Sequence, residues 1–233
     1  MKALLSKGIN VAGLDIQVED MKNIYAQTPS HSGSGKFYPI GCDVASANAI
    51  SMAFEEVERE LGGVDIMVNN AGVIDYGKII ESDRSTFERI VNINFLGYAT
   101  CTREAVQSMR ARNVEGHIFN VNSVLGLEIP ESTTSGCFEQ KGFNVYPACK
   151  HGTVAMTHSI RREIQAAKLP IRVTSISPGI VKTAIARSAG IHDLFDRISA
   201  LKPEDIADGL LYALGTRPEV QVTELTIRRT GEL

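Results

Sequence analysis

The sequence lacks features that would place it in several protein classes. No apolar run approaches the roughly 20 residues that a membrane-spanning helix requires. The first residues, MKALLSKGINVAGLD, are too mixed for a signal peptide, because Lys7 interrupts them before a long apolar stretch forms. The formal net charge is only -3, which gives no electrostatic reason to expect nucleic acid or an anionic membrane as a partner.

Cysteine is also scarce, and no metal-binding pattern is present. The four cysteines are Cys42, Cys101, Cys137 and Cys149. None belongs to a CxxC pair, and none has a histidine at metal-ligand spacing. The five histidines are spread over predicted loops, a strand and a helix, so we expect structural or solvated roles for them. Without a secretory signal, we expect reduced thiols, no bound metal and a cytoplasmic enzyme.

What is present is the composition of an ordinary globular protein. The chain has 233 residues, of which 43% are hydrophobic and 22% are charged, which suits a large domain with a sizeable core. No internal repeat, low-complexity tract or interdomain linker divides the chain. We therefore expect residues 1–233 to form a single domain.

Short apolar or β-branched runs alternate with longer amphipathic stretches. The predicted strands are Ile9–Leu14, Phe37–Ile40, Val64–Val68, His117–Val121, Ile171–Ile176 and Val222–Ile227. The predicted helices are Ser46–Leu61, Ser85–Ala111, Tyr146–Ala167 and Pro203–Leu214. This βαβα rhythm predicts an α/β fold, a doubly wound parallel sheet with helices on both faces.

Two segments interrupt this rhythm. Glu128–Asn144 is rich in Ser, Thr, Gly and Pro, so we expect a loop that leads to the helix beginning near Tyr146. Lys182–Ala200 follows a Pro-Gly turn and has a weak helical pattern. It is either a lid over a substrate or a plain surface excursion.

Several polar and glycine-containing groups follow the predicted strands and helices in a fixed order. Along the chain they are Asp43-Val44, Asn69-Asn70-Ala71-Gly72, Asn94, Ser123, Tyr146 with Lys150 in YPACK, and Pro178-Gly179 with Val181 and Thr183. YxxxK alone would be weak evidence. The ordered set resembles the short-chain dehydrogenase/reductase family over essentially the whole chain, and this family has a Rossmann-like fold.

Chemistry explains why three of these residue types should meet. Tyr146 and Lys150 are four residues apart, so on a helix they share one face. A free tyrosine has a pKa near 10, and we expect the neighbouring ammonium to lower it toward the working range. Ser123 can hydrogen-bond the oxygen of a substrate. The resemblance implies that Lys150 also binds the nicotinamide ribose and that Asn94 holds a water in a proton relay.

Each of these residues also has an ordinary alternative role. Tyr146 could pack at the start of a helix, and Lys150 could be a solvated surface lysine. Ser123 could cap a turn, and Asn94 could bond local backbone. The agreement of all four with the family order favours the catalytic interpretation, because independent accidents would have to coincide.

The cofactor side of the pattern begins with Asp15, at the end of the first predicted strand. A carboxylate there can accept hydrogen bonds from the adenosine ribose and repel a 2′-phosphate, which favours NAD and does not exclude NADP. The alternative is a surface turn aspartate. The resemblance implies that Asp43-Val44 contacts the adenine and that Asn70-Ala71-Gly72 lies against the adenosine. It also implies that the segment from Pro178 to Thr183 touches the nicotinamide carboxamide.

The glycine loop of this family is missing from the sequence. Family members begin with a strand that runs into TGxxxGIG and then a helix, whereas here Met1–Lys7 resembles only the end of that helix. The Gly-rich stretch His31–Lys36 precedes a strand, so its amides would not face a pyrophosphate, and we expect a flexible loop. Without the first strand, its neighbours would face each other across roughly 10 Å with unpaired edges, unless they close up. We expect an N-terminally incomplete version of an ordinary enzyme, with a damaged or remodelled product as the alternative.

The family branch narrows the expected activity. FNVYPACKHG and the segment from Pro203 onward resemble insect farnesol dehydrogenase-like and related steroid/retinol-type reductases. This implies hydride transfer between NAD(P) and an alcohol or ketone group of a small or medium lipophilic substrate, in a homodimer or homotetramer. The rival hypothesis is a catalytically impaired family member that acts only through dimerisation by the helices Ser85–Ala111 and Tyr146–Ala167.

Overall fold

The computed structural model describes residues 1–28, 32–129, 142–185 and 199–232. Its strands are β1 (Val11–Asp15), β2 (Phe37–Gly41), β3 (Ile66–Asn69), β4 (Gly116–Val121), β5 (Ile171–Pro178) and β6 (Glu224–Ile227). Its α-helices are α1 (Lys2–Leu5), α2 (Val18–Ala26), α3 (Ala47–Leu61), α4 (Arg84–Val91), α5 (Gly97–Arg112), α6 (Tyr146–Ala166) and α9 (Pro203–Leu214). No helix in the described ranges is long and apolar enough to cross a membrane.

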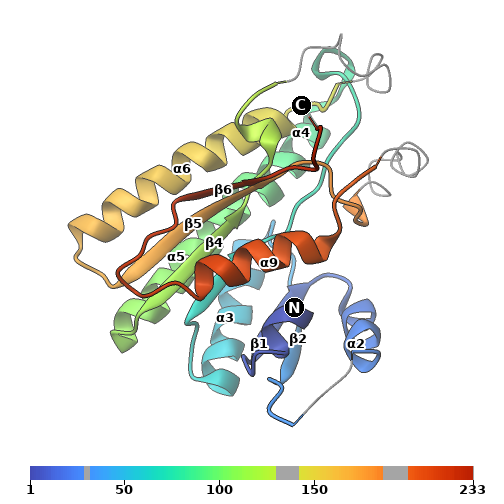
Figure 1. Ribbon diagram of the computed structural model, residues 1–233. Helices are drawn as coiled ribbons and strands as arrows, with labels where there is room; N and C mark the ends of the chain where they lie inside the picture. Colours follow the sequence, from blue (N-terminus) through green and yellow to red (C-terminus); the bar gives the residue numbers. More distant parts are fainter. Residues whose placement is uncertain (29–31, 130–141, 186–198, 233) are drawn as a thin grey trace.

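The strands form parallel sheets with helices on both faces, as the sequence predicts. One sheet has the order β3-β4-β5-β6, and every neighbouring pair in it is parallel. Helices α5 and α6 lie on one face of this sheet and α9 on the other (Figure 1). Because the strands run in the same direction, their carboxyl ends meet at one edge, where ligands bind in open α/β sheets.

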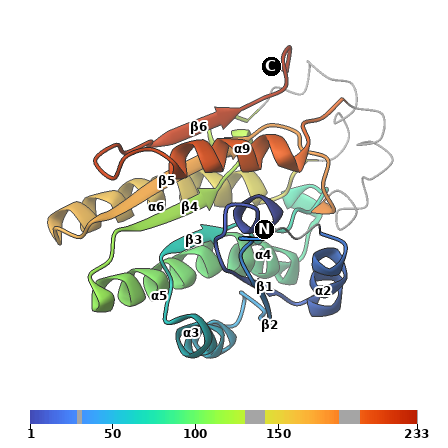
Figure 2. The same cartoon turned by 60° about the horizontal axis from the view of Figure 1, so that its bottom comes forward.

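The predicted gap is present in the structure. Strands β1 and β2 pair with each other in a separate parallel sheet, and in the described part of the chain neither β1 nor β2 pairs with β3. Figure 2 shows β1 and β2 set apart from the β3–β6 sheet. The edges of β1 and β3 have therefore not closed up.

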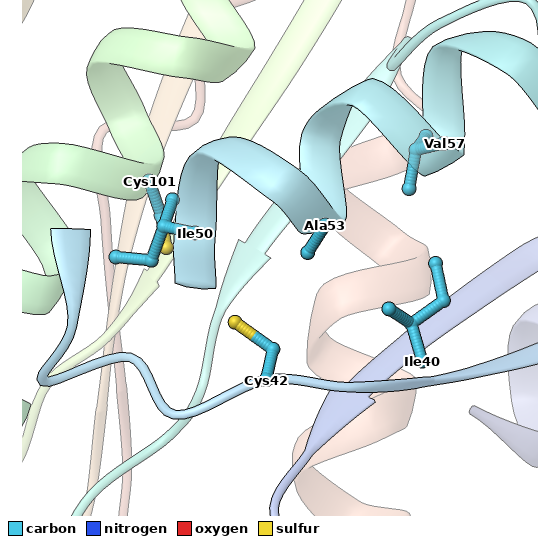
Figure 3. Packing of buried hydrophobic residues seen from close by; sticks show 6 residues of the cluster. All are labelled: Ile40, Cys42, Ile50, Ala53, Val57 and Cys101. Carbon is cyan, nitrogen blue, oxygen red and sulfur yellow. The ribbon is translucent and has the colours of Figure 1, made fainter. Parts of the chain in front are cut away.

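Side-chain packing connects the two sheets. Ile50, Ala53 and Val57 lie along one face of α3 and point toward Ile40 and Cys42, with Cys101 of α5 beside Ile50 (Figure 3). Val64 and Met67, next to and within β3, pack against the same cluster. The thiols of Cys42, Cys101 and Cys149 are buried and free, whereas Cys137 lies outside the described residues.

One predicted helix is interrupted. The sequence predicts a continuous helix over Ser85–Ala111, but the structure has α4, then a π-helical turn over Asn92–Leu96, then α5. A π-turn widens the helix by one residue and costs hydrogen-bond geometry, so its presence needs a local cause. Here the side chain of Asn94, in the middle of the turn, bonds backbone outside the helix.

The predicted irregular segments are only partly described. Residues 130–141 of the predicted loop Glu128–Asn144 and residues 186–198 of the predicted lid Lys182–Ala200 lie outside the described residues. His31 of the Gly-rich stretch also lies outside them. The N-terminal stretch predicted to be helical forms the short helix α1, which has Leu5 buried and contacts α9.

A substitution at Gly97, the first residue of α5, tests how closely this helix approaches the loop after β2. A Cβ added at Gly97 would lie 2.9 Å from the carbonyl oxygen of Val44, so backbone would have to move. We expect Gly97→Ala to lower the free energy of unfolding by about 1–3 kcal/mol, measured by urea denaturation. The control is Gly41→Ala, whose Cβ would lie 3.4 Å from the nearest atom, a Val18 methyl group. Equal stability of the two variants would contradict this close approach.

Candidate active site

A groove of about 2460 Å³ runs along the carboxyl ends of the strands and into the gap between β1 and β3. The predicted site residues that line it are Asp15, Asp43, Val44, Asn70, Ala71, Gly72, Ser123, Tyr146, Lys150, Pro178, Gly179, Val181 and Thr183. Asn94 is the predicted site residue that does not line it. The structure thus brings residues from most of the chain to one concave surface, as ligand sites require.

Tyr146 lies at the first position of α6, and Ser123 lies two residues after the end of β4. Both side chains line the groove, and the Ser123 hydroxyl accepts a hydrogen bond from the N–H of Leu125 at 3.1 Å. Burial raises the pKa of Tyr146 to about 12, and the Ser123 side chain opposes this shift. The sequence-based prediction that Lys150 lowers this pKa was therefore wrong, because the loss of solvent around the phenol outweighs the other influences.

Lys150 lies one helical turn after Tyr146 and is also buried. Its Nζ donates a hydrogen bond to the carbonyl oxygen of Val121 at 2.8 Å and to the hydroxyl of Tyr98 at 3.3 Å. The same atom lies 5.7 Å from the centre of the Tyr146 ring. Burial lowers the pKa of Lys150 to about 7, and the neighbouring Cys149 opposes this shift. The ammonium is therefore poised to lose or gain a proton near neutral pH.

Tyr98 of α5 is a contributor to the site that the sequence reasoning missed. Its side chain is 2% exposed, and its hydroxyl donates to the carbonyl oxygen of Val121 at 2.9 Å while it accepts from Lys150. The Lys150 Nζ also lies 4.9 Å from the centre of the Tyr98 ring. Burial raises the pKa of Tyr98 far above its usual value, so this hydroxyl remains protonated. No sequence signal links a residue of α5 to a lysine 52 positions later.

Asn94 supports the site from behind the groove. Its side-chain oxygen accepts from the backbone N–H of Val73 at 2.9 Å, and its side-chain nitrogen donates to the carbonyl oxygen of Val73 at 2.7 Å. Both ends of the amide are thus committed to the segment that follows β3. The backbone carbonyl of Asn94 accepts from Thr153 of α6 at 3.3 Å. The predicted role of Asn94 in a proton relay stays a prediction.

Asn144 is a second residue that the sequence reasoning missed. It adopts a left-handed conformation with φ of 52°, which asparagine tolerates better than most residues. Its side-chain nitrogen donates to Ser82 at 2.6 Å and to Asp75 at 3.2 Å, and its backbone N–H donates to the carbonyl oxygen of Gly77. These bonds fix the entry into α6 and so the position of Tyr146. The sequence signal that could have identified it is an asparagine two residues before the predicted start of a helix, because asparagine favours turns and left-handed backbone.

The predicted adenosine side of the groove carries exposed acidic groups. Asp15 is the last residue of β1, and one of its carboxylate oxygens accepts from the N–H of Gln17 at 2.9 Å. Asp43 makes the equivalent bond to the N–H of Ala45, also at 2.9 Å. Each carboxylate therefore has a fixed orientation at the end of a strand.

Gly72 lies close to Asn94, since a Cβ on it would be 3.1 Å from the Asn94 side-chain oxygen.

The segment after β5 is held by backbone pairing with Leu201, which lies just before α9. The N–H of Lys182 donates to the carbonyl oxygen of Leu201 at 2.9 Å, and the N–H of Leu201 donates to that of Ile180 at 2.8 Å. Val181 lies between these two bonds in a parallel bridge. In such a bridge the intervening N–H points to the other side. Within the described ranges, the Val181 N–H has no partner.

Other candidates from the sequence do not enter the groove. Gly33 and Gly35 of the Gly-rich stretch are absent from its described lining, in agreement with the prediction that they do not replace the glycine loop. His117 is buried beside Thr174 at 2.8 Å, and burial followed by repulsion from Arg172 lowers its pKa to about 3. It therefore has the predicted structural role.

The twin bond between Asn94 and Val73 leads to a stability prediction. Asn94→Ala removes the side-chain partners of both the N–H and the carbonyl oxygen of Val73, so we expect the free energy of unfolding to fall by about 2–4 kcal/mol. The control is Asn48→Ala on the exposed face of α3, whose side-chain nitrogen donates to the Met52 sulfur at 3.5 Å. Urea denaturation measures both variants. Similar stabilities would show that Asn94 does not brace this segment.

The lowered pKa of Lys150 leads to a pH prediction. A buried lysine with a folded-state pKa near 7 and an unfolded value near 10.4 penalises the folded state most at low pH, and the penalty falls as the pH rises through this window. We expect wild type to gain stability relative to Lys150→Met by about 1 kcal/mol per pH unit between pH 7 and pH 10. Urea denaturation at several pH values measures this, with exposed Lys7→Met as control. A pH-independent difference would refute it.

Comparison with known proteins gives consistent results. A sequence model described as short chain dehydrogenase matches residues 1–193. The chain is 38% identical to farnesol dehydrogenase of Aedes aegypti over 98% of its own length and 89% of that protein. It is 33% identical to dehydrogenase/reductase SDR family member 11 of Bos taurus, over 100% of this chain and 91% of that one.

A solved structure supports the fold assignment. The structure resembles an alcohol dehydrogenase from the archaeon Thermococcus sibiricus, complexed with 5-hydroxy-NADP, with a TM-score of 0.79 at 20% identity. The match covers 97% of this chain and 88% of that one. Together with the sequence matches, the groove that gathers Ser123, Tyr146 and Lys150 identifies the chain as a member of the short-chain dehydrogenase/reductase family of oxidoreductases.

Proposed function

We propose that this protein transfers a hydride between a nicotinamide cofactor and an alcohol or ketone group of a small or medium lipophilic substrate. The observation that carries the proposal is that Ser123, Tyr146 and buried Lys150, one helical turn after Tyr146, line one groove at the carboxyl edge of the parallel sheet. The names of its relatives, a farnesol dehydrogenase and an alcohol dehydrogenase, are in keeping with this chemistry.

The residues of the site suit proton transfer at a carbonyl oxygen. The cofactor would supply or accept the hydride at its nicotinamide ring. With its pKa raised to about 12, Tyr146 is protonated at neutral pH and can donate its proton to the oxygen of a ketone substrate. Ser123 can donate a second hydrogen bond to that oxygen and so stabilise developing negative charge. Lys150 then favours the resulting phenolate when it is charged.

Apolar side chains around Tyr146 support a lipophilic substrate. Leu125, Phe143 and Ile185 line the groove and pack in the cluster that contains Tyr146. Such walls exclude water from the reacting oxygen and bind hydrocarbon, with about 25 cal/mol gained per Å² of apolar surface removed from water.

Two parts of the groove fit the two ends of a dinucleotide. The Val181 N–H is a donor that could bind the nicotinamide carboxamide, and Lys150 could hold the adjoining ribose. At the other end, the fixed carboxylate of Asp15 could accept from ribose hydroxyls, which favours NAD over NADP. Between these ends, the described lining offers no glycine turn at the start of a helix to bind the pyrophosphate.

The gap between β1 and β3 is compatible with the rival hypothesis, a catalytically impaired family member that acts only through dimerisation. A family member that binds no cofactor could still associate through its surface helices. Helices α5 and α6 lie on the same sheet face (Figure 1) and would form the interface of the proposed homodimer. Cofactor binding is the observation that separates the two hypotheses.

Titration with NADH tests the proposed function directly. We expect saturable binding, followed by cofactor fluorescence, and turnover of a medium-chain ketone. Tyr146→Phe removes the proton donor, so we expect turnover to fall by at least 100-fold while the NADH dissociation constant changes less than about threefold. Tyr212→Phe, at a tyrosine that is 65% exposed on α9, is the matched control.

Two outcomes would contradict the proposal. Absence of saturable binding at millimolar NADH would favour the non-catalytic dimer. Retained turnover in Tyr146→Phe would exclude Tyr146 as the proton donor, even if cofactor binds.

A further inference from the structure

The chain beyond β6 returns to the groove. Strand β6 ends at Ile227, and its last residue accepts a hydrogen bond from the N–H of Gly179 at 2.8 Å. Past this point the chain turns at Gly231, which has φ of 81°, a conformation that glycine adopts without strain. Arg229, Gly231 and Glu232 then line the same groove as the segment after β5.

The half-buried side chain of Glu232 is directed at the segment after β5. One carboxylate oxygen accepts from the backbone N–H of Ile180 at 3.0 Å, and the other accepts from the N–H of Arg229 at 3.2 Å. The N–H of Glu232 also donates to the carbonyl oxygen of Arg229 at 2.9 Å. The carboxylate therefore ties the end of the chain to the turn that follows β5.

Gly179 provides the space for this contact. A Cβ at Gly179 would lie 2.1 Å from the Glu232 carboxylate oxygen, far inside contact distance. No side chain could occupy position 179 without expelling the carboxylate. The contact with Glu232 therefore requires glycine at position 179, whether or not a ligand also approaches this backbone.

A second ion pair holds the same stretch of chain. The guanidinium of Arg228 pairs with the carboxylate of Glu128, which follows the turn that begins at Ser123. The terminal stretch Arg228–Glu232 thus bridges the loop after β4, which carries Ser123, and the loop after β5. Both loops flank the reacting end of the groove.

The pairing of Ile180 decides which amide remains available. The N–H of Ile180 is held by Glu232 and that of Lys182 by Leu201, while the intervening N–H of Val181 faces away from both. We propose that Glu232 is a positioning residue for the cofactor: by holding the Ile180 N–H it fixes the peptide next to the one that carries the Val181 N–H, so that the Val181 N–H is presented to the nicotinamide carboxamide. This inference rests on the proposed function and adds the chain terminus to its site.

A comparison of two ligands tests the role of Glu232. ADP-ribose contains the adenosine and both riboses of NADH but lacks the nicotinamide. A charge-assisted hydrogen bond contributes about 1.5 kcal/mol, so we expect Glu232→Ala to weaken NADH binding about tenfold and to leave ADP-ribose binding within twofold of wild type. Glu232→Gln keeps an acceptor oxygen and should lose less affinity than Glu232→Ala. Glu219→Ala, at an exposed glutamate before β6, is the control.

Hydrogen exchange provides a readout without any ligand. In Glu232→Ala the Ile180 amide loses its acceptor, so we expect its exchange to accelerate at least tenfold relative to wild type, with Val173 in the middle of β5 unchanged.

The outcomes separate this inference from the proposed function. Equal NADH affinity in wild type and Glu232→Ala, an equal loss of both ligands, or unchanged exchange at Ile180 would each overturn the role of Glu232 alone. Failure of wild type to bind either ligand would overturn the proposed function and the role of Glu232 with it.

Discussion

The parallel ladder of β3, β4, β5 and β6 is the constraint on which the site depends. Parallel pairing fixes the register of neighbouring strands, so Val121 at the end of β4 is paired with Ile176 of β5. Residues that follow each strand are thereby delivered to one edge from positions far apart in the sequence. Ser123 and the turn at Pro178 meet there because β4 and β5 end at this edge, and the start of α6 brings Tyr146 to the same place.

Burial is the second determinant of the chemistry. Removing an ammonium and a phenol from water disfavours the charged form of each, and this shifts the pKa of Lys150 down to about 7 and that of Tyr146 up to about 12. The protein compensates Lys150 with two neutral oxygen acceptors, the carbonyl of Val121 and the hydroxyl of Tyr98. These neutral acceptors orient the ammonium but do not stabilise its charge as a carboxylate would. The protonation of Lys150 can therefore change when a charged group binds next to it.

Periodic patterns in the sequence predicted the strands and the longer helices, but neither helix α2 nor the irregularities. The alternation of apolar runs and amphipathic stretches predicted all six described strands within about two residues, and the family spacing placed Ser123, Tyr146 and Lys150 on the correct elements. The π-turn around Asn94 could not be predicted, because the bonds that accompany it join Asn94 to Val73, 21 residues away. The direction of the Tyr146 pKa shift was wrong for a related reason. Sequence spacing identifies a charged neighbour, but the degree of burial depends on elements that only the folded chain brings together.

The two ends of the groove are held by forces of different kinds. At the end that holds Tyr146, backbone ladders fix the ends of β4, β5 and β6, and the hydrogen bonds of Asn144 fix the entry into α6. At the other end, β1 and Asp15 are joined to the main sheet by apolar packing around α3, with no backbone pairing to β3 among the described residues. Apolar packing is non-directional, so it sets proximity without setting register. Because a dinucleotide would contact both ends at once, its affinity would depend on how well this packing holds the β1–β2 sheet at the required distance, while the proposed proton transfer would depend on the end that holds Tyr146.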